Sequence, residues 1–396
     1  MEEAFFRTHT YLVEHTDAPV RRTLMDEIDW NDRMIGIKGT RGVGKSTFLL
    51  QYAKEHFGPH DRKCLYVNMN NFYFQSRGIA DFAGDFVNQG GRTLLIDQVF
   101  KQQDWSKELR KCYDLYPELK IVFTGSSVMR LKEENPELNG IVKSYNLRGF
   151  SFREYINLKT GNDFQPYELD DILRNHEHII KQILPKVSPM KYFNDYLHHG
   201  FYPFFLEQRN FTENLLKTMN MMTEVDILLI KQIELKYLPK IKRLFYELAV
   251  EGAKAPNVSQ LAESINTSRA TVMNYIKYLA DSRLINMIYP DGQAFPKKPS
   301  KVMMHNTNLM YAIYPIQIDK QEVMETFFVN SLWKDHKVHQ GGKDHYYTVD
   351  GNRKFRICDA QTPNKMRSNP DTIYARYNTE VGKDNKIPLW LLGFLY

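Results

Sequence analysis

Between residues 34 and 147 the chain alternates short apolar runs with longer amphipathic segments. The runs have the length of strands and the segments between them have the period of helices, a pattern typical of a parallel α/β sheet. The segment Asp104–Tyr116 carries apolar side chains on one helical face and charged ones on the other, as expected of a helix that covers a sheet. The predicted strands are Met34–Lys38, Cys64–Met69, Leu94–Asp97, Ile121–Thr124 and Val142–Leu147.

After residue 150 the pattern changes. We expect helices from Ser151 to Ile241, then three short helices, a strand at Leu284–Tyr289 and a turn at Asp291-Gly292. Beyond residue 300 a helix over Gln321–His336 is mixed with short strand-like runs. The three short helices are predicted at Ile241–Val250, Val258–Ile265 and Ser268–Ala280. The predicted domains are residues 1–150, 151–240, 241–300 and 301–396.

Composition excludes several classes of protein. The chain has 396 residues, of which 42% are hydrophobic and 25% charged, so it is neither a disordered tail nor a fibre. At about 150 residues per domain, length alone predicts two or three domains. The three cysteines match no zinc or redox spacing. No apolar window approaches the roughly 18 residues of a membrane span, and the N-terminus lacks the order of a signal peptide. We therefore expect a cytoplasmic protein without a membrane partner.

A phosphate-binding loop follows the first predicted strand. The sequence GTRGVGKS at residues 39–46 fits G-x-x-x-x-G-K-[ST] and precedes a predicted helix. Glycines let backbone N–H groups converge on a phosphate, and the helix N-terminus favours its negative charge. Lys45 is expected to reach the β- and γ-phosphates, and Ser46 to bind Mg²⁺. The motif predicts ATP and Mg²⁺ as cofactors, bound by Gly39, Thr40, Arg41, Gly42, Val43, Gly44, Lys45, Ser46 and Thr47.

Two further strand ends carry candidate site residues. Asp97 ends the run Leu94–Asp97, where a second acid for the magnesium ion is required, so the predicted metal-binding residues are Ser46 and Asp97. The fourth strand ends in Thr124-Gly125-Ser126-Ser127. Its hydroxyl groups are expected to face the γ-phosphate, with Ser126 or Thr124 positioning the attacking water.

Several stretches resemble one known family. KGTRGVGKSTFLLQY, TLLIDQVFKQQDWSKELRKCYDLYPELKIVFTGSS and YNLRGFSFREYINL are similar to the AAA-type ATPases of bacteria and archaea that carry a winged helix and a C-terminal domain related to restriction-endonuclease-like folds. Later stretches such as HHGFYPFF agree, so the resemblance spans nearly the whole chain. It implies an α/β fold: a P-loop NTPase parallel sheet, a helical subdomain, a winged helix and a C-terminal α+β endonuclease-like domain.

The chain departs from this family at catalytic positions. Relatives normally carry Glu after the magnesium-binding Asp, whereas this chain has Gln98, which can orient a water but cannot accept its proton. Gln98 is either the natural residue of a slow ATPase or an introduced one that retains ATP. Lys45, Gln98 and Ser126 are the predicted catalytic residues. Relatives also often show two arginines near residues 138–141, where this chain has none, so Arg130 or Arg148 is the candidate arginine finger.

The later domains leave two interpretations open. On the third short helix Arg269, Asn274 and Lys277 face outward and are candidate DNA contacts. A winged helix that only packs as a structural lid is the alternative. In the C-terminal domain Arg356 and Ala360 stand where the resemblance implies an acid and a lysine. We expect a non-catalytic domain there, with Glu325 as its remaining acid.

Three functions are compatible with these residues. The leading prediction is an ATP-binding switch with slow hydrolysis to ADP and phosphate. The alternatives are an ATP-dependent DNA-binding or DNA-processing protein and a nucleotide-stabilised scaffold with negligible turnover. The net charge of +6 permits duplex DNA as a partner without requiring it. A protein partner or a homo-oligomer is also compatible with the sequence.

Overall fold

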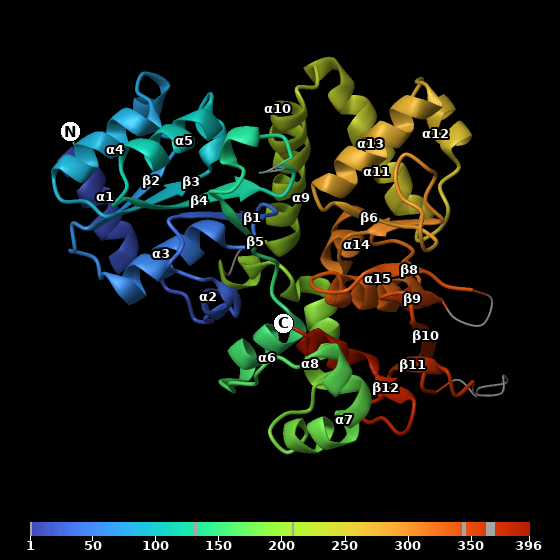
Figure 1. Ribbon diagram of the computed structural model, residues 1–396. Helices are drawn as coiled ribbons and strands as arrows, with labels where there is room; N and C mark the ends of the chain where they lie inside the picture. Colours follow the sequence, from blue (N-terminus) through green and yellow to red (C-terminus); the bar gives the residue numbers. More distant parts are fainter. Residues whose placement is uncertain (1, 130, 132, 208–209, 343–345, 362–368) are drawn as a thin grey trace. The chain divides into compact units, whose positions relative to one another are not determined.

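The computed structural model describes residues 2–129, 131, 133–207, 210–342, 346–361 and 369–396. The chain divides into two compact units, residues 1–148 and 149–396, called the first and the second unit below (Figure 1). The break lies two residues before the boundary expected at residue 150. Across the described ranges, the structure has no helix that is both long enough and apolar enough to span a membrane.

The first unit is built on a five-stranded sheet in the order β2-β3-β4-β1-β5, with every neighbouring pair parallel. All five predicted strands are present. Because the strands are parallel, their carboxyl ends meet at one edge, and β4 lies between β3 and β1 at that edge. The strands are β1 (Met34–Gly39), β2 (Cys64–Asn68), β3 (Thr93–Asp97), β4 (Lys120–Ser126) and β5 (Lys143–Asn146).

Helices cover this sheet. Figure 1 shows α4 and α5 over one face of the sheet and α3 over the other. Every residue of β3 is buried, as expected of a strand covered on both faces. The predicted helix over residues 104–116 is confirmed as α5. The helices are α1 (Glu2–Glu14), α2 (Leu24–Glu27), α3 (Lys45–His56), α4 (Ile79–Asn88) and α5 (Trp105–Leu115), with 3₁₀ turns η1 (Phe72–Gln75), η2 (Val99–Lys101) and η3 (Pro136–Leu138).

The second unit begins with the expected helices, two of which contain π-helical turns. Its first part comprises α6 (Phe152–Thr160), α7 (Leu169–Ile183), α8 (Met190–Asp195), η4 (Tyr196–Gly200), η5 (Pro203–Glu207), α9 (Phe211–Met221), η6 (Met222–Ile227), α10 (Leu228–Lys231) and η7 (Leu235–Tyr237).

Three helices and one strand follow at the predicted positions, and a second strand pairs with the first. The helices are α11 (Leu238–Glu251), α12 (Val258–Ser264) and α13 (Arg269–Asp281). Strands β6 (Ile285–Ile288) and β7 (Lys301–Met304) pair antiparallel. The Ser268 side chain accepts the Thr271 N–H and so caps the start of α13. The winged-helix assignment of these elements stays a prediction.

The C-terminal part forms a second five-stranded sheet in the order β12-β11-β10-β9-β8. The pairs β10–β11 and β11–β12 are parallel, and β9 is antiparallel to both of its neighbours. The elements are α14 (Thr307–Ile313), α15 (Lys320–Leu332), β8 (Val338–Gln340), β9 (Tyr347–Val349), β10 (Arg353–Asp359), β11 (Thr372–Tyr377), β12 (Lys386–Pro388) and η8 (Leu389–Phe394).

One hydrophobic core joins segments that the sequence pattern separates. Phe193 of α8 packs edge-on against Phe327 of α15, with ring centroids 4.9 Å apart. Phe152 of α6 likewise meets Phe394 of η8 at 6.3 Å. The segments 151–240, 241–300 and 301–396 therefore lie in one compact unit, and the first and last of them bury their apolar faces against each other. Hydrophobic periodicity describes each segment alone, so it cannot predict that distant segments share one core.

Candidate functional site

Residues 39–47, called the phosphate loop below, connect β1 to α3. Gly42 and Gly44 have φ angles of 79° and 92°, in the left-handed region that favours glycine. At Gly39 a Cβ atom would lie 2.4 Å from the Leu147 carbonyl oxygen, so only glycine fits beside that backbone. The first helical hydrogen bond of α3 runs from the Phe48 N–H to the Gly44 carbonyl. The N–H groups in the first turn of such a helix point toward the loop, where they favour an anion.

The two polar side chains of the motif contact the loop and the end of β3. The Lys45 ammonium donates to the carbonyl oxygens of Gly39 and Thr40, at 2.8 and 2.7 Å, and so lies against the start of the loop. The Ser46 hydroxyl donates to Oδ2 of Asp97 at 2.7 Å. The structure therefore brings together the loop and the acid at the end of β3, which are 51 residues apart in the chain.

Asp97 is the centre of a hydrogen-bond network. Only 1% of its surface is exposed, so its carboxylate needs polar partners inside the protein. Four side chains supply them, and three of the four donate to Oδ2. These are the Ser46 hydroxyl at 2.7 Å, the Tyr66 hydroxyl at 2.8 Å and the Asn68 amide at 3.0 Å, while the Thr124 hydroxyl donates to Oδ1. The network fixes the carboxylate at the carboxyl edge of the sheet.

The backbone of Gln98 has an unusual conformation that a hydrogen bond holds in place. Its φ of 56° is unusual for a residue with a side chain, and its N–H donates to the Thr124 hydroxyl at 2.8 Å. A non-glycine residue in this conformation persists only where its surroundings hold it, and Thr124 is one of those contacts. The half-buried side chain of Gln98 thus starts from a fixed position next to Asp97.

Of the two candidates at the end of β4, Thr124 contacts the site residues. It bridges Asp97 and the Gln98 N–H. The hydroxyl oxygen of Ser126 instead accepts the Val128 N–H in a local turn, at 3.4 Å, and Ser126 is 3% exposed. Thr124 is therefore the better candidate for a positioning group, although the sequence analysis placed Ser126 in the catalytic set.

Sequence reasoning missed the two donors on β2. Tyr66 and Asn68 are two residues apart on one strand, so their side chains share a face, and Asn68 lies opposite Asp97 in the β2–β3 register. The alternation was visible in the sequence, but the pairing of β2 with β3 was not. Burial and the neighbouring Asp97 carboxylate raise the pKa of Tyr66. Its hydroxyl therefore keeps its proton and donates to Asp97.

Helix α1 contacts the same strand through a buried histidine. Nδ1 of His9 accepts the Tyr66 N–H at 3.0 Å, and His9 is fully buried. Burial lowers the pKa of His9 from 6.5 to about 4. The neutral ring is thus the form that fits the folded protein, with Nδ1 unprotonated.

This histidine should make folding depend on pH. Between pH 6.5 and pH 4 the unfolded chain binds a proton that the folded protein does not, so the free energy of unfolding falls as the pH falls. The contribution of His9 is complete above pH 6.5, and from pH 7 to pH 5 we expect a loss of about 2 kcal/mol. Denaturant unfolding at both values measures it. In a His9→Asn variant, whose amide oxygen can accept the same N–H without titrating, this part of the loss should vanish. An equal pH dependence of the two proteins would contradict the assignment.

The candidate arginines remain predictions. Arg130 lies outside the described residues. Arg148 is half-buried at the end of the first unit, where its carbonyl oxygen accepts a hydrogen bond from Arg22 at 2.7 Å. Among the candidate DNA contacts on α13, Arg269 and Asn274 are exposed as expected. Lys277 is instead partly buried and its ammonium pairs with the Asp281 carboxylate, because the two lie one turn apart on the helix.

The acidic side chains of the C-terminal part each bond to different partners. Glu325 accepts hydrogen bonds from Lys301 at 2.6 Å and from the Tyr347 hydroxyl at 2.7 Å. Asp359 accepts from the Asn378 amide, and Asp350 is bonded to His336 and Arg353. Within the described ranges no three or more His, Cys, Asp or Glu side chains are gathered to hold a metal ion. The non-catalytic interpretation of this domain stays a prediction.

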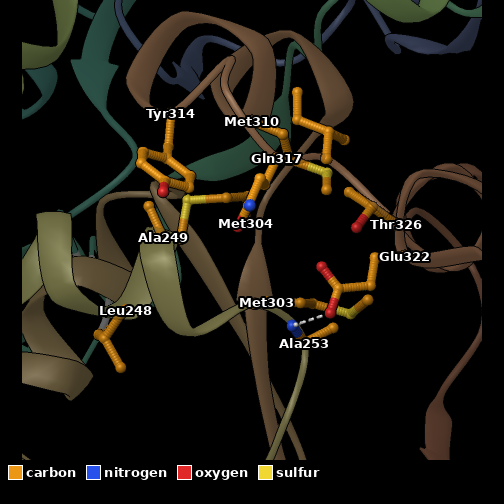
Figure 2. A pocket seen from close by; sticks show the side chains of 12 residues that line it. Leu248, Ala249, Ala253, Met303, Met304, Met310, Tyr314, Gln317, Glu322 and Thr326 are labelled. Atoms are coloured by element: carbon orange, nitrogen blue, oxygen red, sulfur yellow. Dashed lines mark hydrogen bonds between the residues drawn. The ribbon is translucent and has the colours of Figure 1, made fainter. Parts of the chain in front are cut away.

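A small pocket in the second unit differs chemically from the phosphate loop (Figure 2). Figure 2 shows Met303, Met304 and Met310 around it, with Glu322 at one side, where the carboxylate accepts the Ala253 N–H at 3.1 Å. Burial raises the pKa of Glu322. The described residues that line the pocket include no basic side chain, so it offers no cationic partner for a phosphate.

Comparison with known proteins finds matches to parts of the chain. Residues 31–156 match the family model described as an AAA domain, and residues 190–320 match a domain of unknown function. An uncharacterized protein of Methanocaldococcus jannaschii is 26% identical over 294 residues, which cover 70% of this chain and 61% of that protein. The chain thus matches less than two thirds of this relative's length.

Solved structures of low similarity were also found. The DNA complex of Aeropyrum pernix ORC1 is 11% identical, with a TM-score of 0.29, over 80% of this chain and 92% of the other. AMPPCP-bound DnaA of Aquifex aeolicus is 13% identical, with a TM-score of 0.23, over 69% and 86%. A DNA polymerase III gamma subunit-related protein of Thermotoga maritima is 14% identical, with a TM-score of 0.27, over 70% and 98%.

Proposed function

We propose that the first unit binds ATP with Mg²⁺ in the phosphate loop and that the protein acts as a nucleotide-dependent switch with slow hydrolysis. The observation that carries this proposal is the contact between Ser46 and Asp97 beside a complete phosphate loop. It joins two sequence-distant oxygen ligands of the type that Mg²⁺ prefers. The AAA domain matched at residues 31–156 supports the same assignment.

The residues of the loop fit a polyphosphate. The positive-φ glycines and the start of α3 direct backbone N–H groups toward one place, and the Lys45 ammonium lies beside them. The Ser46 hydroxyl and the Asp97 carboxylate would hold the magnesium ion, directly or through water. The ion would neutralise charge on the β- and γ-phosphates. Both side chains currently bond each other, so binding would exchange that hydrogen bond for contacts with the ion.

Slow hydrolysis follows from the residue after Asp97. The amide of Gln98 can hold a water by hydrogen bonds, but it cannot take the proton that the water must lose when it attacks. Thr124, which bonds the Gln98 N–H, would keep this group aimed at the site. Bound ATP would then last longer than in a protein with Glu at this position, as a switch requires.

The second unit would respond to the nucleotide that the first unit binds. Nucleotide in the first unit would bias how the second unit is arranged, and hydrolysis would reset it. Arg269 and Asn274 are exposed on α13, so a DNA-binding function stays an alternative, with Lys277 withdrawn into its pair with Asp281. A nucleotide-stabilised scaffold is the other alternative.

Nucleotide binding can be tested by calorimetry. We expect one ATP to bind per chain in the presence of Mg²⁺, because the chain carries one complete phosphate loop. Adenosine, which lacks the phosphates that the loop contacts, should give far weaker binding under the same conditions. Equal affinity for ATP and adenosine, or binding of neither, would contradict the proposal.

A further inference from the structure

Arg22 is a buried arginine that the phosphate-loop motif does not include. It lies immediately before α2, and 8% of its surface is exposed. A buried guanidinium is stable only where hydrogen-bond acceptors surround it. Two of its acceptors are backbone carbonyl oxygens, at 3.1 Å on Val43 and at 2.7 Å on Arg148.

The contact with Val43 reaches the middle of the phosphate loop. A trans peptide is planar, with its C=O and N–H pointing in opposite directions. Holding the Val43 carbonyl on the Arg22 side therefore turns the Gly44 N–H away from Arg22. Gly44 is the last residue before α3 and has a φ of 92°, a region in which glycine has conformational freedom. By holding the Val43 carbonyl, Arg22 restricts the backbone of Gly44, whose N–H is expected to contact the phosphate.

The contact with Arg148 gives the guanidinium a second anchor. Residues 147 and 148 follow β5 and lie against the start of the loop. The Leu147 N–H donates to the Lys38 carbonyl at 2.8 Å, and the Leu147 carbonyl oxygen lies 2.4 Å from where a Cβ on Gly39 would be. Arg22 thus ties the flexible middle of the loop to a backbone segment that is itself bonded to β1.

We propose that Arg22 is a positioning residue for nucleotide binding, which presets the phosphate loop by holding the Val43 carbonyl against the segment after β5. The inference rests on the proposed function of the loop. Only the planar fork of arginine places donors toward two carbonyls in a fixed geometry. Lysine keeps the charge but presents one ammonium, so it can hold one carbonyl well and the other poorly.

The test compares three variants by calorimetric titration with ATP and Mg²⁺. Loss of one hydrogen bond from a charged donor should weaken ATP binding about tenfold or more in Arg22→Lys and in Arg22→Ala. The matched control is Arg21→Ala, because Arg21 is a neighbouring arginine whose exposed side chain pairs with Asp26 and Glu55 instead. Its affinity for ATP should equal that of the unaltered protein.

A second measurement separates positioning from general stability. Guanidinium chloride at low, non-denaturing concentration should restore part of the ATP affinity of Arg22→Ala by filling the vacated position, and sodium chloride at equal ionic strength should not. Unaltered affinity in Arg22→Lys, or no rescue of Arg22→Ala, would overturn the inference; if Arg22→Ala does not fold, the comparison of Arg22→Lys with Arg21→Ala decides. Failure of the unaltered protein and of Arg21→Ala to bind ATP would instead overturn the proposed function, and the inference with it.

Discussion

Replacing Gln98 by Glu should raise the rate of ATP hydrolysis by roughly 10²- to 10⁴-fold, the usual contribution of a general base. The two side chains have nearly the same size and shape. The backbone of residue 98 is held at a φ of 56° and by the Thr124 hydroxyl, so the new carboxylate should take the position of the amide. The change therefore adds a proton acceptor without moving the site. Phosphate release under single-turnover conditions measures the effect.

The control for this variant is its affinity for ATP. Because residue 98 follows Asp97, the proposed magnesium ligand, and is not part of the phosphate loop, ATP should bind Gln98→Glu about as tightly as it binds the unaltered protein. A structure of the unaltered protein incubated with ATP and Mg²⁺ should show an intact γ-phosphate. Rapid turnover by the Gln98 protein, or no gain on introducing Glu, would move the catalytic role to another residue.

Replacing Lys45 by Ala should weaken ATP binding by roughly 10- to 150-fold. A hydrogen bond from a charged donor is worth about 1.5–3 kcal/mol, and the ammonium is the group expected to contact the β- and γ-phosphates. In the structure the ammonium donates to the carbonyl oxygens of Gly39 and Thr40 in its own loop, and we expect the fold to survive its removal. Calorimetric titration with ATP and Mg²⁺ measures the loss.

A second lysine on the same helix serves as the control. Lys54 also lies on α3, but its exposed ammonium donates to the Thr16 carbonyl, away from the phosphate loop. Lys54→Ala changes the net charge by the same amount, so it reports any effect of overall charge on binding. Equal ATP affinity of Lys45→Ala and Lys54→Ala would rule out the assigned role of Lys45.

The sequence predicts the parts of the site that lie close together in the chain. The glycines, Lys45 and Ser46 share one motif, and its chemistry fixes their spacing, so their roles could be assigned before the fold was known. Asp97 could be added because an acid is needed at the end of a neighbouring strand. In the structure a hydrogen bond joins Ser46 to Asp97, and their role as magnesium ligands stays a prediction.

The contacts that depend on strand order could not be predicted. Asn68 reaches Asp97 because β2 pairs with β3, and nothing in either strand specifies that neighbour. Arg22 meets Val43 only after the chain has folded around β1. At the end of β4, the sequence cannot decide between Thr124 and Ser126, because the two side chains lie on the same face of the strand. The structure distinguishes them, since the Ser126 hydroxyl accepts the Val128 N–H in the turn that follows the strand.

Helix α1 determines where the first unit can be cut from the chain. Strand β2 is an edge of the sheet, and His9 of α1 accepts its Tyr66 N–H. Phe5 of α1 also packs against Phe74 of η1 and Phe82 of α4. A fragment that starts at residue 31, where the match to the AAA domain begins, leaves this edge open to pairing with another chain. It also lacks Arg22. A fragment made for biophysical work should therefore keep the first 30 residues, since the stable unit is larger than the recognisable family segment.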